Sequence, residues 1–515
     1  MLEDRPQQIL SIDRLAWNFQ DATTCGAQMK RLKEWDMERS NARKLYCLHT
    51  KAQQERFAMS LQKSYQMNII DGVFQAKLNP DHELLILAEK IDWEGLAEEL
   101  APNYSKSGRN GKPIRLMVGA HLLKHMFDVS DEQVVARLTG DVYWIAFCGI
   151  DQAFRTADWS PLDPSTMTYF RKRIGANGVQ KIEAIVRDHL IAEKRIAPKS
   201  QFVDTTAMEK NVAYPTDTDL LNKGRRNVLN GIKKLQGLGR RINVGRTFSR
   251  LAKKVLLTIA KLGKDRQQRI EEGATKLAKF AKIVLTRVPG ALRKAKKHKD
   301  KKTQQQIEAV QEQIRKDAEL LDRVIKQSES RYAGEHVKNK IYSLHEPRVT
   351  CIAKGKRGRP NEYGSKVSIS VDRNGFVVDH QEYDNNVGDN TTLDQAVSGW
   401  EAATGQVPEE LAADRGYHTA EYSETVQAVA RIAIPRTGKT KHPDSGKHHF
   451  KRLQRKRASI EPIISHLKSD HRMNRSRYKG FEGDRINVAF AVSAWNVRKW
   501  MRQLSKERRD AAIKA

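Results

Sequence analysis

Three acidic residues of this 515-residue chain lie in settings that suit chemistry on a charged substrate. Asp204 is part of the apolar segment QFVDTTAM, and Asp414 ends the apolar segment ELAAD. Glu461 stands among basic residues in RKRASIEPIISHLKSDHR. An aspartate inside a buried strand is costly unless a partner compensates its charge. A divalent cation is such a partner, so the three acids are candidate metal ligands.

Glu461 shares one face of a predicted helix with basic residues. At 100° per residue, Arg457 lies about 40° and Lys468 about 20° from Glu461 on the helix surface. Arg472 falls on the same stripe if the helix continues. One interpretation is a metal-binding carboxylate flanked by cations that hold phosphates. The other is a simple Arg457–Glu461 pair at i,i+4, which contributes roughly 0.2–0.5 kcal/mol. The stripe alone does not decide between them.

The elements that must position these acids follow from hydrophobic periodicity. QFVDTTAM is typical of a buried strand, and ELAAD and RIAIP predict two further short strands. KVSISVD and FVVDHQEY predict a hairpin in which Gly375 takes a positive φ. Helices are expected over residues 391–403 and 419–430 and around Glu461. This order predicts an α/β core, a mixed sheet flanked by helices.

A long helical insertion follows the first strand. Thr216 is the predicted N-cap, and Asp217 and Asp219 stand in the first turn, where the helix dipole favours acids. Apolar residues recur at heptad-like spacing and predict helices packed as an antiparallel hairpin. These residues are Ile307, Val310, Ile314, Leu321 and Val324.

The charge of the chain indicates its partner. The sequence has 93 Lys and Arg against 62 Asp and Glu, a net charge of +31, which favours a polyanion first and a membrane surface second. Residues 221–300 alone hold 24 Lys and Arg against four Asp and Glu, a difference of +20. A solvated face or a pure oligomerisation hairpin is the alternative. We favour contact with the DNA backbone, because such like charges repel one another without an anion.

The first 200 residues are predicted to be helical. Ser130 and Gln133 are spaced as a capping box, and Ser165 is the predicted cap of a short helix that Gly175 ends. That helix carries three consecutive basic residues, Arg171, Lys172 and Arg173. The segment is either a helix that enters a DNA groove or a basic surface helix, and the sequence leaves both open.

The sequence argues against a membrane-spanning protein, a secreted protein and a cysteine-bound metal site. The sequence has no run of 18 apolar residues and no secretory signal pattern at its N-terminus. Its four cysteines show no metal-ligand spacing, so we expect reduced thiols in a cytosolic protein. They are Cys25, Cys47, Cys148 and Cys351.

The motifs together resemble a known family. Arg457-x3-Glu461-x6-Lys468 is similar to the signature of bacterial insertion-sequence transposases with a DDE catalytic core. The group is named for its Tyr-x2-Arg-x3-Glu-x6-Lys motif and includes the insertion-sequence four and five families. FVDTT with YPTD, and ADRGY, resemble its two aspartate boxes, and PLDPSTMTYFRKRIG resembles part of its N-terminal domain. The resemblance covers residues 110–500. One residue departs from it, because Gln454 stands at the tyrosine position.

The resemblance implies a ribonuclease H-like core with Asp204, Asp414 and Glu461 around two Mg²⁺ ions roughly 3.5–4 Å apart, with Mn²⁺ as a substitute. The ions would activate first water and then the freed 3′-hydroxyl of the element. Arg457 and Lys468, with Arg472 on their stripe, would hold phosphates. The implied partners are double-stranded DNA, as element ends and target, and a second copy of the chain on paired ends. No membrane partner is expected, and the implied location is the cytoplasm, at the nucleoid.

The predicted organisation has five parts. They are a helical N-terminal domain that binds DNA ends (1–200), the first core strand (201–216), the basic helical insertion (217–335), the remaining catalytic core (336–505) and a basic tail (506–515). Two other functions share the same features. One is a transposase-derived DNA-binding protein without catalysis, and the other is a metal-dependent nuclease without strand transfer.

Overall fold

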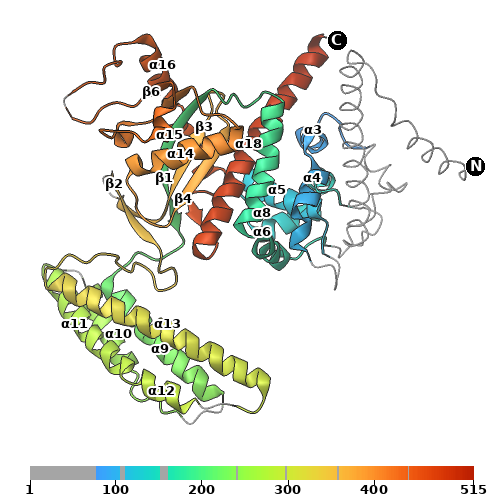
Figure 1. Ribbon diagram of the computed structural model, residues 1–515. Helices are drawn as coiled ribbons and strands as arrows, with labels where there is room; N and C mark the ends of the chain where they lie inside the picture. Colours follow the sequence, from blue (N-terminus) through green and yellow to red (C-terminus); the bar gives the residue numbers. More distant parts are fainter. Residues whose placement is uncertain are drawn as a thin grey trace, which may run out of the picture. The chain divides into compact units, whose positions relative to one another are not determined.

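A computed structural model of the chain describes residues 77–104, 111–150, 160–238, 242–261, 263–295, 298–356, 359–438 and 440–514. The chain divides into two units, residues 1–66 with 104–113 and residues 67–103 with 114–515. The elements described below belong to the second unit (Figure 1). The expectations for residues 1–76, which include Cys25 and Cys47, lie outside the described residues. Each helix within the described ranges is too short or too polar to cross a membrane.

Helices precede the first strand. They are α3 (Glu83–Lys90), α4 (Trp93–Leu100), η1 (Ala101–Asn103), α5 (Ile114–Met126), α6 (Asp131–Leu138), α7 (Val142–Phe147) and α8 (Pro164–Ala192). α6 begins with the predicted capping box of Ser130 and Gln133. The predicted cap of α8 is wrong: Asp163 is its N-cap, because Pro164 takes the first helical position, where a missing N–H costs nothing. Gly175 has the non-helical angles φ +61° and ψ −170° and divides α8 into two helical stretches, so the short helix predicted before it does end at this glycine.

The core is a seven-stranded mixed sheet. Its strands are β1 (Ser200–Lys210), β2 (Thr350–Lys356), β3 (Arg359–Val371), β4 (Val377–Tyr383), β5 (Glu410–Ala412), β6 (Arg431–Ala433) and β7 (Arg475–Ser476). β1 is central, antiparallel to β3 and parallel to β5 and β7. β3 pairs with β2 along its first half and with β4 along its second, and β6 lies parallel to β5. The predicted strands and the hairpin are confirmed, and Gly375 has φ +81° in the turn.

Helices cover both faces of this sheet. They are α14 (Asp389–Thr404), η2 (Arg415–Tyr417), α15 (Glu424–Gln427), α16 (His448–Arg457), α17 (Ile460–Ser469) and α18 (Gly480–Lys514). Successive side chains of β1 point to opposite faces. Phe202 packs with apolar residues of α16, α17 and α18, whereas Val203 packs with α14 and the segment after β5. The helix predicted over 419–430 is shortened to α15, because Ser423 caps it from within that segment.

The described residues of the insertion after β1 form five helices. They are α9 (Asp217–Gly237), α10 (Ser249–Ala260), α11 (Arg266–Leu285), α12 (Val288–Lys294) and α13 (Lys301–Tyr332). Thr216 is the N-cap of α9, as predicted, and accepts a hydrogen bond from the Asp219 N–H. The predicted hairpin is incomplete, because α11 and α12 also contribute to the packing of α9 and α13.

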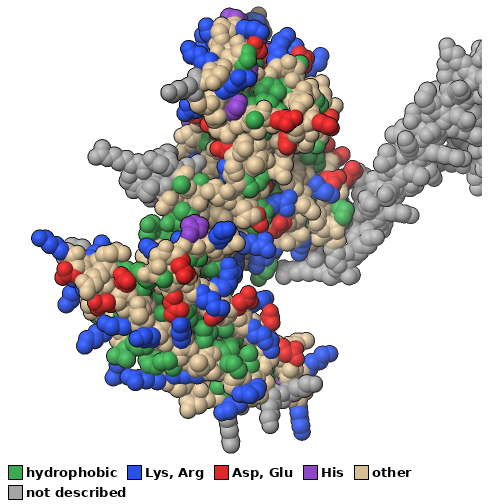
Figure 2. Space-filling view, turned by 60° about the vertical axis from the view of Figure 1, so that its left-hand side comes forward, with side chains coloured by type: hydrophobic (Ala, Val, Ile, Leu, Met, Phe, Trp, Pro, Cys, Tyr) green, Lys and Arg blue, Asp and Glu red, His purple; other side chains and the backbone are tan. Residues whose placement is uncertain are grey.

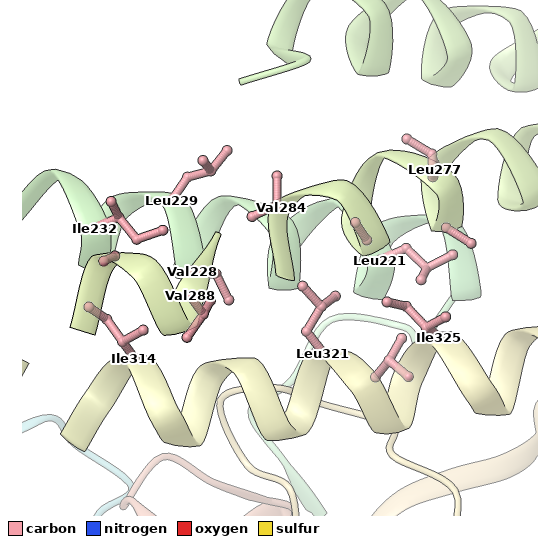
Figure 3. Packing of buried hydrophobic residues seen from close by; sticks show 14 of the residues in the cluster. Leu221, Val228, Leu229, Ile232, Leu277, Val284, Val288, Ile314, Leu321 and Ile325 are labelled. Carbon is pink, nitrogen blue, oxygen red and sulfur yellow. The ribbon is translucent and has the colours of Figure 1, made fainter. Parts of the chain in front are cut away.

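One apolar core holds the insertion together (Figure 3). Ile314 and Leu321 of α13 are fully buried against α9. Two glycines of α9 permit this close approach. A Cβ on Gly231 would lie 2.4 Å from Ile314 Cγ1, and one on Gly224 would lie 2.7 Å from Leu321 Cδ1. Ile314 and Leu321, two of the heptad-like residues of α13, therefore pack against the side of α9 where glycine leaves room for them.

Candidate active site

Asp204 lies in the middle of β1, on the face that α17 covers. Its side chain is 19% exposed, and its Oδ1 accepts a hydrogen bond from the Thr205 N–H at 2.8 Å. Burial, and next the charge of Asp414, raise the pKa of Asp204 to about 6, while the Thr205 N–H and Arg457 act in the opposite direction. A buried carboxylate beside a second carboxylate is a site that favours a cation.

Asp414 follows the end of β5, just past the point where β5 stops pairing with β1. The two strands pair in parallel from Ser200 and Glu410 to Phe202 and Ala412. The same register, continued for two residues, places Asp414 beside Asp204, beyond the last ladder pair. The Asp414 Oδ1 accepts a hydrogen bond from the Gly416 N–H at 2.7 Å, which fixes the carboxylate at the start of η2. β1 and β5 stop pairing two residues before these acids, and Asp204 and Asp414 therefore lie at equivalent positions of the two strands.

Glu461 lies in the first turn of α17, and its side chain is 64% exposed. The single helix expected around it is wrong, because α16 ends at Arg457 and α17 begins at Ile460. Pro462 explains the break: it has no N–H to donate to the carbonyl four residues earlier and fits only a first turn.

Arg457 keeps its predicted position next to Glu461 in spite of this break. Its Nη2 lies 3.3 Å from Glu461 Oε1, and its Nη1 lies 3.8 Å from Asp204 Oδ2. The guanidinium thus connects an acid of the sheet with an acid of the covering helix. The Arg457–Glu461 pair that the sequence indicates is therefore present, but Arg457 also contacts Asp204.

The other two cations of the stripe differ from each other. Lys468 lies on α17 and is half-buried. Arg472 lies past the end of the helix, because α17 stops at Ser469 and Arg472 has a left-handed φ of +66°. Its Nη1 pairs with Asp128 at 3.0 Å. The placement of Arg472 on the stripe is therefore wrong.

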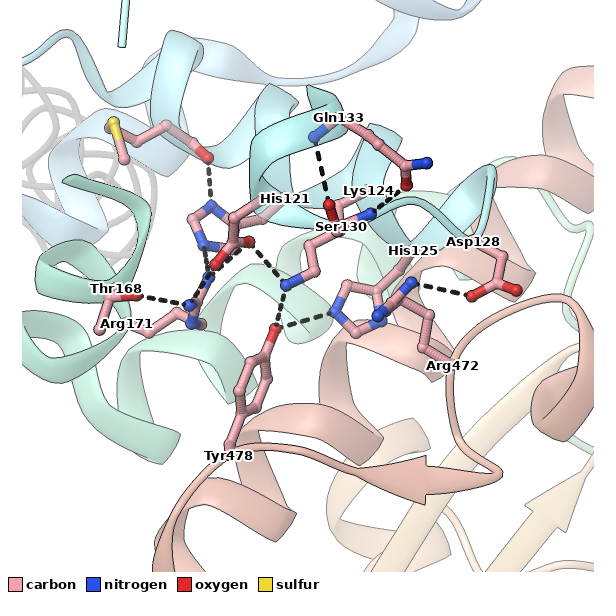
Figure 4. A network of polar contacts seen from close by, with 12 residues as sticks. His121, Lys124, His125, Asp128, Ser130, Gln133, Thr168, Arg171, Arg472 and Tyr478 are labelled. Carbon is pink, nitrogen blue, oxygen red and sulfur yellow. Dashed lines mark hydrogen bonds and ion pairs between the residues drawn. The ribbon is translucent and has the colours of Figure 1, made fainter. Parts of the chain in front are cut away.

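Of the three predicted basic residues on α8, Arg171 is buried. Its guanidinium donates to Asp131 at 2.7 and 3.1 Å and lies 4.5 Å from the ring centroid of Tyr478 (Figure 4). Lys124 also contacts Asp131, at 2.6 Å. Arg171 thus joins α5 and α6 to the segment before α18, and we do not propose it as a DNA contact. Lys172 and Arg173 are exposed.

Gln454, at the position of the signature tyrosine, has a role in the fold. Its Nε2 donates to the carbonyl of Ala413 at 3.0 Å and to the carbonyl of Ala433. Ala413 directly precedes Asp414, and Ala433 ends β6. An amide offers two donors where a tyrosine hydroxyl offers one. Gln454 therefore ties α16 to the ends of two strands, one of which leads to Asp414.

Sequence reasoning missed a fourth acid near the strand ends. Asp389 begins α14, and its Oδ1 lies 2.5 Å from both Thr205 Oγ1 and Lys366 Nζ. The charge of Asp389 also contributes to the raised pKa of Asp204, after burial and Asp414. Its position in the first turn of the helix after the hairpin was the available signal, but this position is equally typical of an acid that only complements the helix dipole.

The donor set suits a hard divalent cation. Mg²⁺ and similar ions prefer carboxylate oxygens. Among the described residues, no three His, Cys, Asp or Glu side chains lie close enough together to enclose an ion unaided. Mg²⁺ tolerates such an open arrangement, because it keeps several waters and commonly binds one or two carboxylates together with substrate phosphates. Asp204, which is partly buried, fits this kind of site together with Asp414.

Comparisons with known proteins agree with these features. Residues 72–173 match the family described as Transposase domain (DUF772), and residues 344–497 match the Transposase DDE domain. An uncharacterized protein of Rhizobium meliloti, ORF8 in the nfe locus, is 35% identical over 195 residues, 37% of this chain and 90% of that protein. No solved structure matches the chain. The two domains, in this order and with acids on both sides of the insertion, place the chain in the family of insertion-sequence transposases with a DDE domain.

Proposed function

We propose that the chain cleaves the ends of an insertion sequence and joins the 3′-hydroxyls to target DNA by phosphoryl transfer at Asp204, Asp414 and Glu461. The observation that carries this proposal is the position of Arg457, which contacts Asp204 on β1 and Glu461 on α17 beside the parting of β1 and β5. The sheet order β4-β3-β1-β5-β6, antiparallel and then parallel, supports a ribonuclease H-like core.

The proposed reaction has two displacements at phosphorus. Water first attacks the phosphodiester at the element end, and the 3′-oxygen leaves as a hydroxyl. That hydroxyl then attacks a phosphodiester of the target, whose own 3′-oxygen leaves. Two Mg²⁺ ions, for which Mn²⁺ can substitute, would lower the charge on the attacking and leaving oxygens. Asp204, Asp414 and Glu461 would hold them.

The chain's own cations would position the DNA. Arg457 contacts Asp204 and Glu461, and Lys468 lies on the same helix as Glu461. Both cations would bind phosphates next to the scissile bond. A groove lies between α17 and α18, and four cations of α18 line it together with Asp470 of the opposite wall. They are Arg498, Lys499, Arg502 and Lys506. This groove supports a path for the phosphate backbone beside the helix that carries Glu461.

The helical insertion would add affinity without sequence preference. Figure 2 shows many Lys and Arg side chains on its surface, with Asp, Glu and hydrophobic side chains between them. Contacts of this kind go to phosphates and carry little base information. Lys172 and Arg173, exposed on α8, are the remaining candidates for contact with the element ends. We further propose that two copies act on paired ends, at the bacterial nucleoid.

The test is an integration assay with the full-length chain. Inverted repeats that bracket the gene supply the cognate ends, and a supercoiled plasmid supplies the target, with Mg²⁺ present. Joined products that require the cognate ends support the transposase. Cutting without joining would favour the nuclease, and binding without cutting would favour the DNA-binding protein without catalysis.

Variants connect the assay to the proposed residues. Asp204→Ala, Asp414→Ala and Glu461→Ala should each abolish cleavage, whereas DNA binding largely survives because remote phosphate contacts supply it. Asp394→Ala, an exposed acid of α14, is the matched control and should cleave normally. Substantial cleavage by any of the first three variants would remove that residue from the site.

A further inference from the structure

We propose that Asp389 is a fourth carboxylate ligand of the divalent-metal site, held in place by Thr205 and Lys366. The inference rests on the proposed function, because it assumes that Asp204 and Asp414 bind a cation. It adds a ligand that comes from α14, on the opposite face of the sheet from the helix that carries Glu461.

The approach of Asp389 follows from the alternation along β1. Asp204 points to the face of α17, so its neighbour Thr205 points to the face of α14. The Thr205 Oγ1 donates to Asp389 Oδ1 at 2.5 Å, and the Thr205 N–H donates to Asp204 Oδ1 at 2.8 Å. A single residue of β1 therefore binds an acid on each face.

Lys366 anchors the same oxygen of Asp389. Its Nζ lies 2.5 Å from Asp389 Oδ1 and 2.6 Å from the carbonyl of Val387, and its side chain is only 10% exposed. Lys366 stands on β3, opposite Ala207 of β1. An ammonium group held between two fixed oxygens restricts the carboxylate to one orientation.

The second oxygen of Asp389 and Asp414 Oδ1 both lie next to Gly416. A Cβ added to Gly416 would lie 3.3 Å from Asp389 Oδ2 and 3.0 Å from Asp414 Oδ1. The two carboxylates thus flank the same point above the η2 backbone. Glycine at 416 leaves that point open, and the described residues provide Asp389 Oδ2 with no hydrogen-bond donor.

A buried hydroxyl beneath the acids provides an independent indication. The Tyr417 side chain is fully buried, and its Oη makes no hydrogen bond of normal geometry with the described residues, although the Thr205 hydroxyl is near. Burial and then the charges of Asp204, Asp389 and Asp414 raise the pKa of Tyr417. A hydroxyl this deeply buried needs a partner, and a water of a hydrated cation held by Asp204 and Asp414 would supply one.

Charge balance supports the same conclusion. Asp204, Asp389, Asp414 and Glu461 bring four negative charges, and Lys366 and Arg457 contact them with two positive ones. The excess of two negative charges is a setting that favours divalent cations. Because three of these acids are at least partly buried, solvent alone compensates them poorly.

The experiment measures binding of Mn²⁺ to the full-length chain without DNA, from the electron paramagnetic resonance signal of free Mn²⁺. Asp389→Asn keeps an acceptor for Thr205 but loses the charge, and it should raise the Kd for Mn²⁺ at least about tenfold. Asp394→Asn removes an equal charge from the same helix and should leave the Kd unchanged. Thermal melts without metal confirm that each variant is folded.

Two further variants separate the possible outcomes. Thr205→Val removes an anchor but keeps the carboxylate, so it should weaken Mn²⁺ binding less than Asp389→Asn does. Equal effects of the two would overturn the ligand role and leave Asp389 as a structural partner of Thr205. Asp204→Asn should abolish binding. If it does while Asp389→Asn has the Kd of the unmodified chain, this inference fails and the proposed function stands; if Asp204→Asn also binds normally, the metal site of the proposed function fails with it.

Discussion

Arg457 Nη1 lies 3.8 Å from Asp204 Oδ2, although the two residues belong to α16 and β1 and are separated by the whole insertion. Its Nη2 contacts Glu461 at the same time. The guanidinium therefore has two fixed acidic neighbours, and a phosphate that enters the site meets a cation already held in position.

Replacement of this cation should slow the reaction more than it weakens the fold. We expect Arg457→Gln and Lys468→Gln each to lower the single-turnover cleavage rate by about 10²-fold, by analogy with the loss of other groups that stabilise transition-state charge. Arg457→Lys should not restore the rate, because only Arg offers a planar fork. The measurement uses a precut-end substrate, and Arg455→Gln, exposed on the same helix, is the control. Near-normal rates for both Gln variants would refute the phosphate contacts.

The insertion should bind DNA through the backbone. Replacement of four exposed lysines in or next to α10 and α11 by Gln should make the plot of log affinity against log salt shallower, by about 0.9 for each phosphate that the variant no longer neutralises. The lysines are Lys253, Lys254 and Lys279, together with Lys261, which directly follows the last residue of α10. Lys326→Gln, in an ion pair with Asp322 on α13, is the control. An unchanged slope would favour the oligomerisation alternative, which light scattering on the same variants would examine.

The buried network around Arg171 should make stability depend on pH. Burial and then the charge of Arg171 lower the pKa of His121 from 6.5 to about 3. Its Nε2 accepts from Arg171 at 3.1 Å, so Nδ1 carries the proton and donates to the Met117 carbonyl at 2.7 Å. The unfolded chain binds the proton more readily, so this stability is present above pH 6.5 and is lost as pH falls toward 3.

His121→Gln removes this titration and retains an acceptor for Arg171. Between pH 6 and pH 4, the free energy of unfolding of the unmodified chain should fall more steeply than that of the variant, by about 1.4 kcal/mol per pH unit. Urea unfolding at a series of pH values measures both slopes. Parallel slopes would mean that His121 is protonated in the folded chain.

Gln454→Met should destabilise the core. The change keeps the length of the side chain but leaves the carbonyls of Ala413 and Ala433 without their donor, at a cost of about 1–3 kcal/mol for each buried group. Gln454→Tyr restores one donor and should recover part of the stability. Chemical denaturation compares the three chains, and equal stability of Met and Gln at this position would show that the two bonds contribute nothing.

Features that depend on residues close in sequence could be predicted from the sequence alone. The caps at Thr216 and Ser130 and the turn at Gly375 each involve residues within four positions, so local geometry decides them. The strands followed from their apolar patterns, and the candidate aspartates followed from their setting inside or directly after those strands. Pro462 also indicates that a helix begins near Glu461. A single helix from Arg457 to Lys468 is therefore not what the sequence predicts once this proline is considered.

The tertiary structure decided which side chains face one another. Periodicity places Arg171 on a face of its helix, but it cannot show that Asp131 and Tyr478 lie opposite that face. An acid in the first turn, such as Asp389, is common in helices without any functional site. Only the packing of α14 on β1 brings Asp389 to Thr205. The sequence by itself thus determined most of the elements, the excess of positive charge and which acids are candidates for the site. Burial and pairing depend on contacts between distant segments, so the fold alone decided the partners of Arg171, Asp389, Gln454 and Arg457.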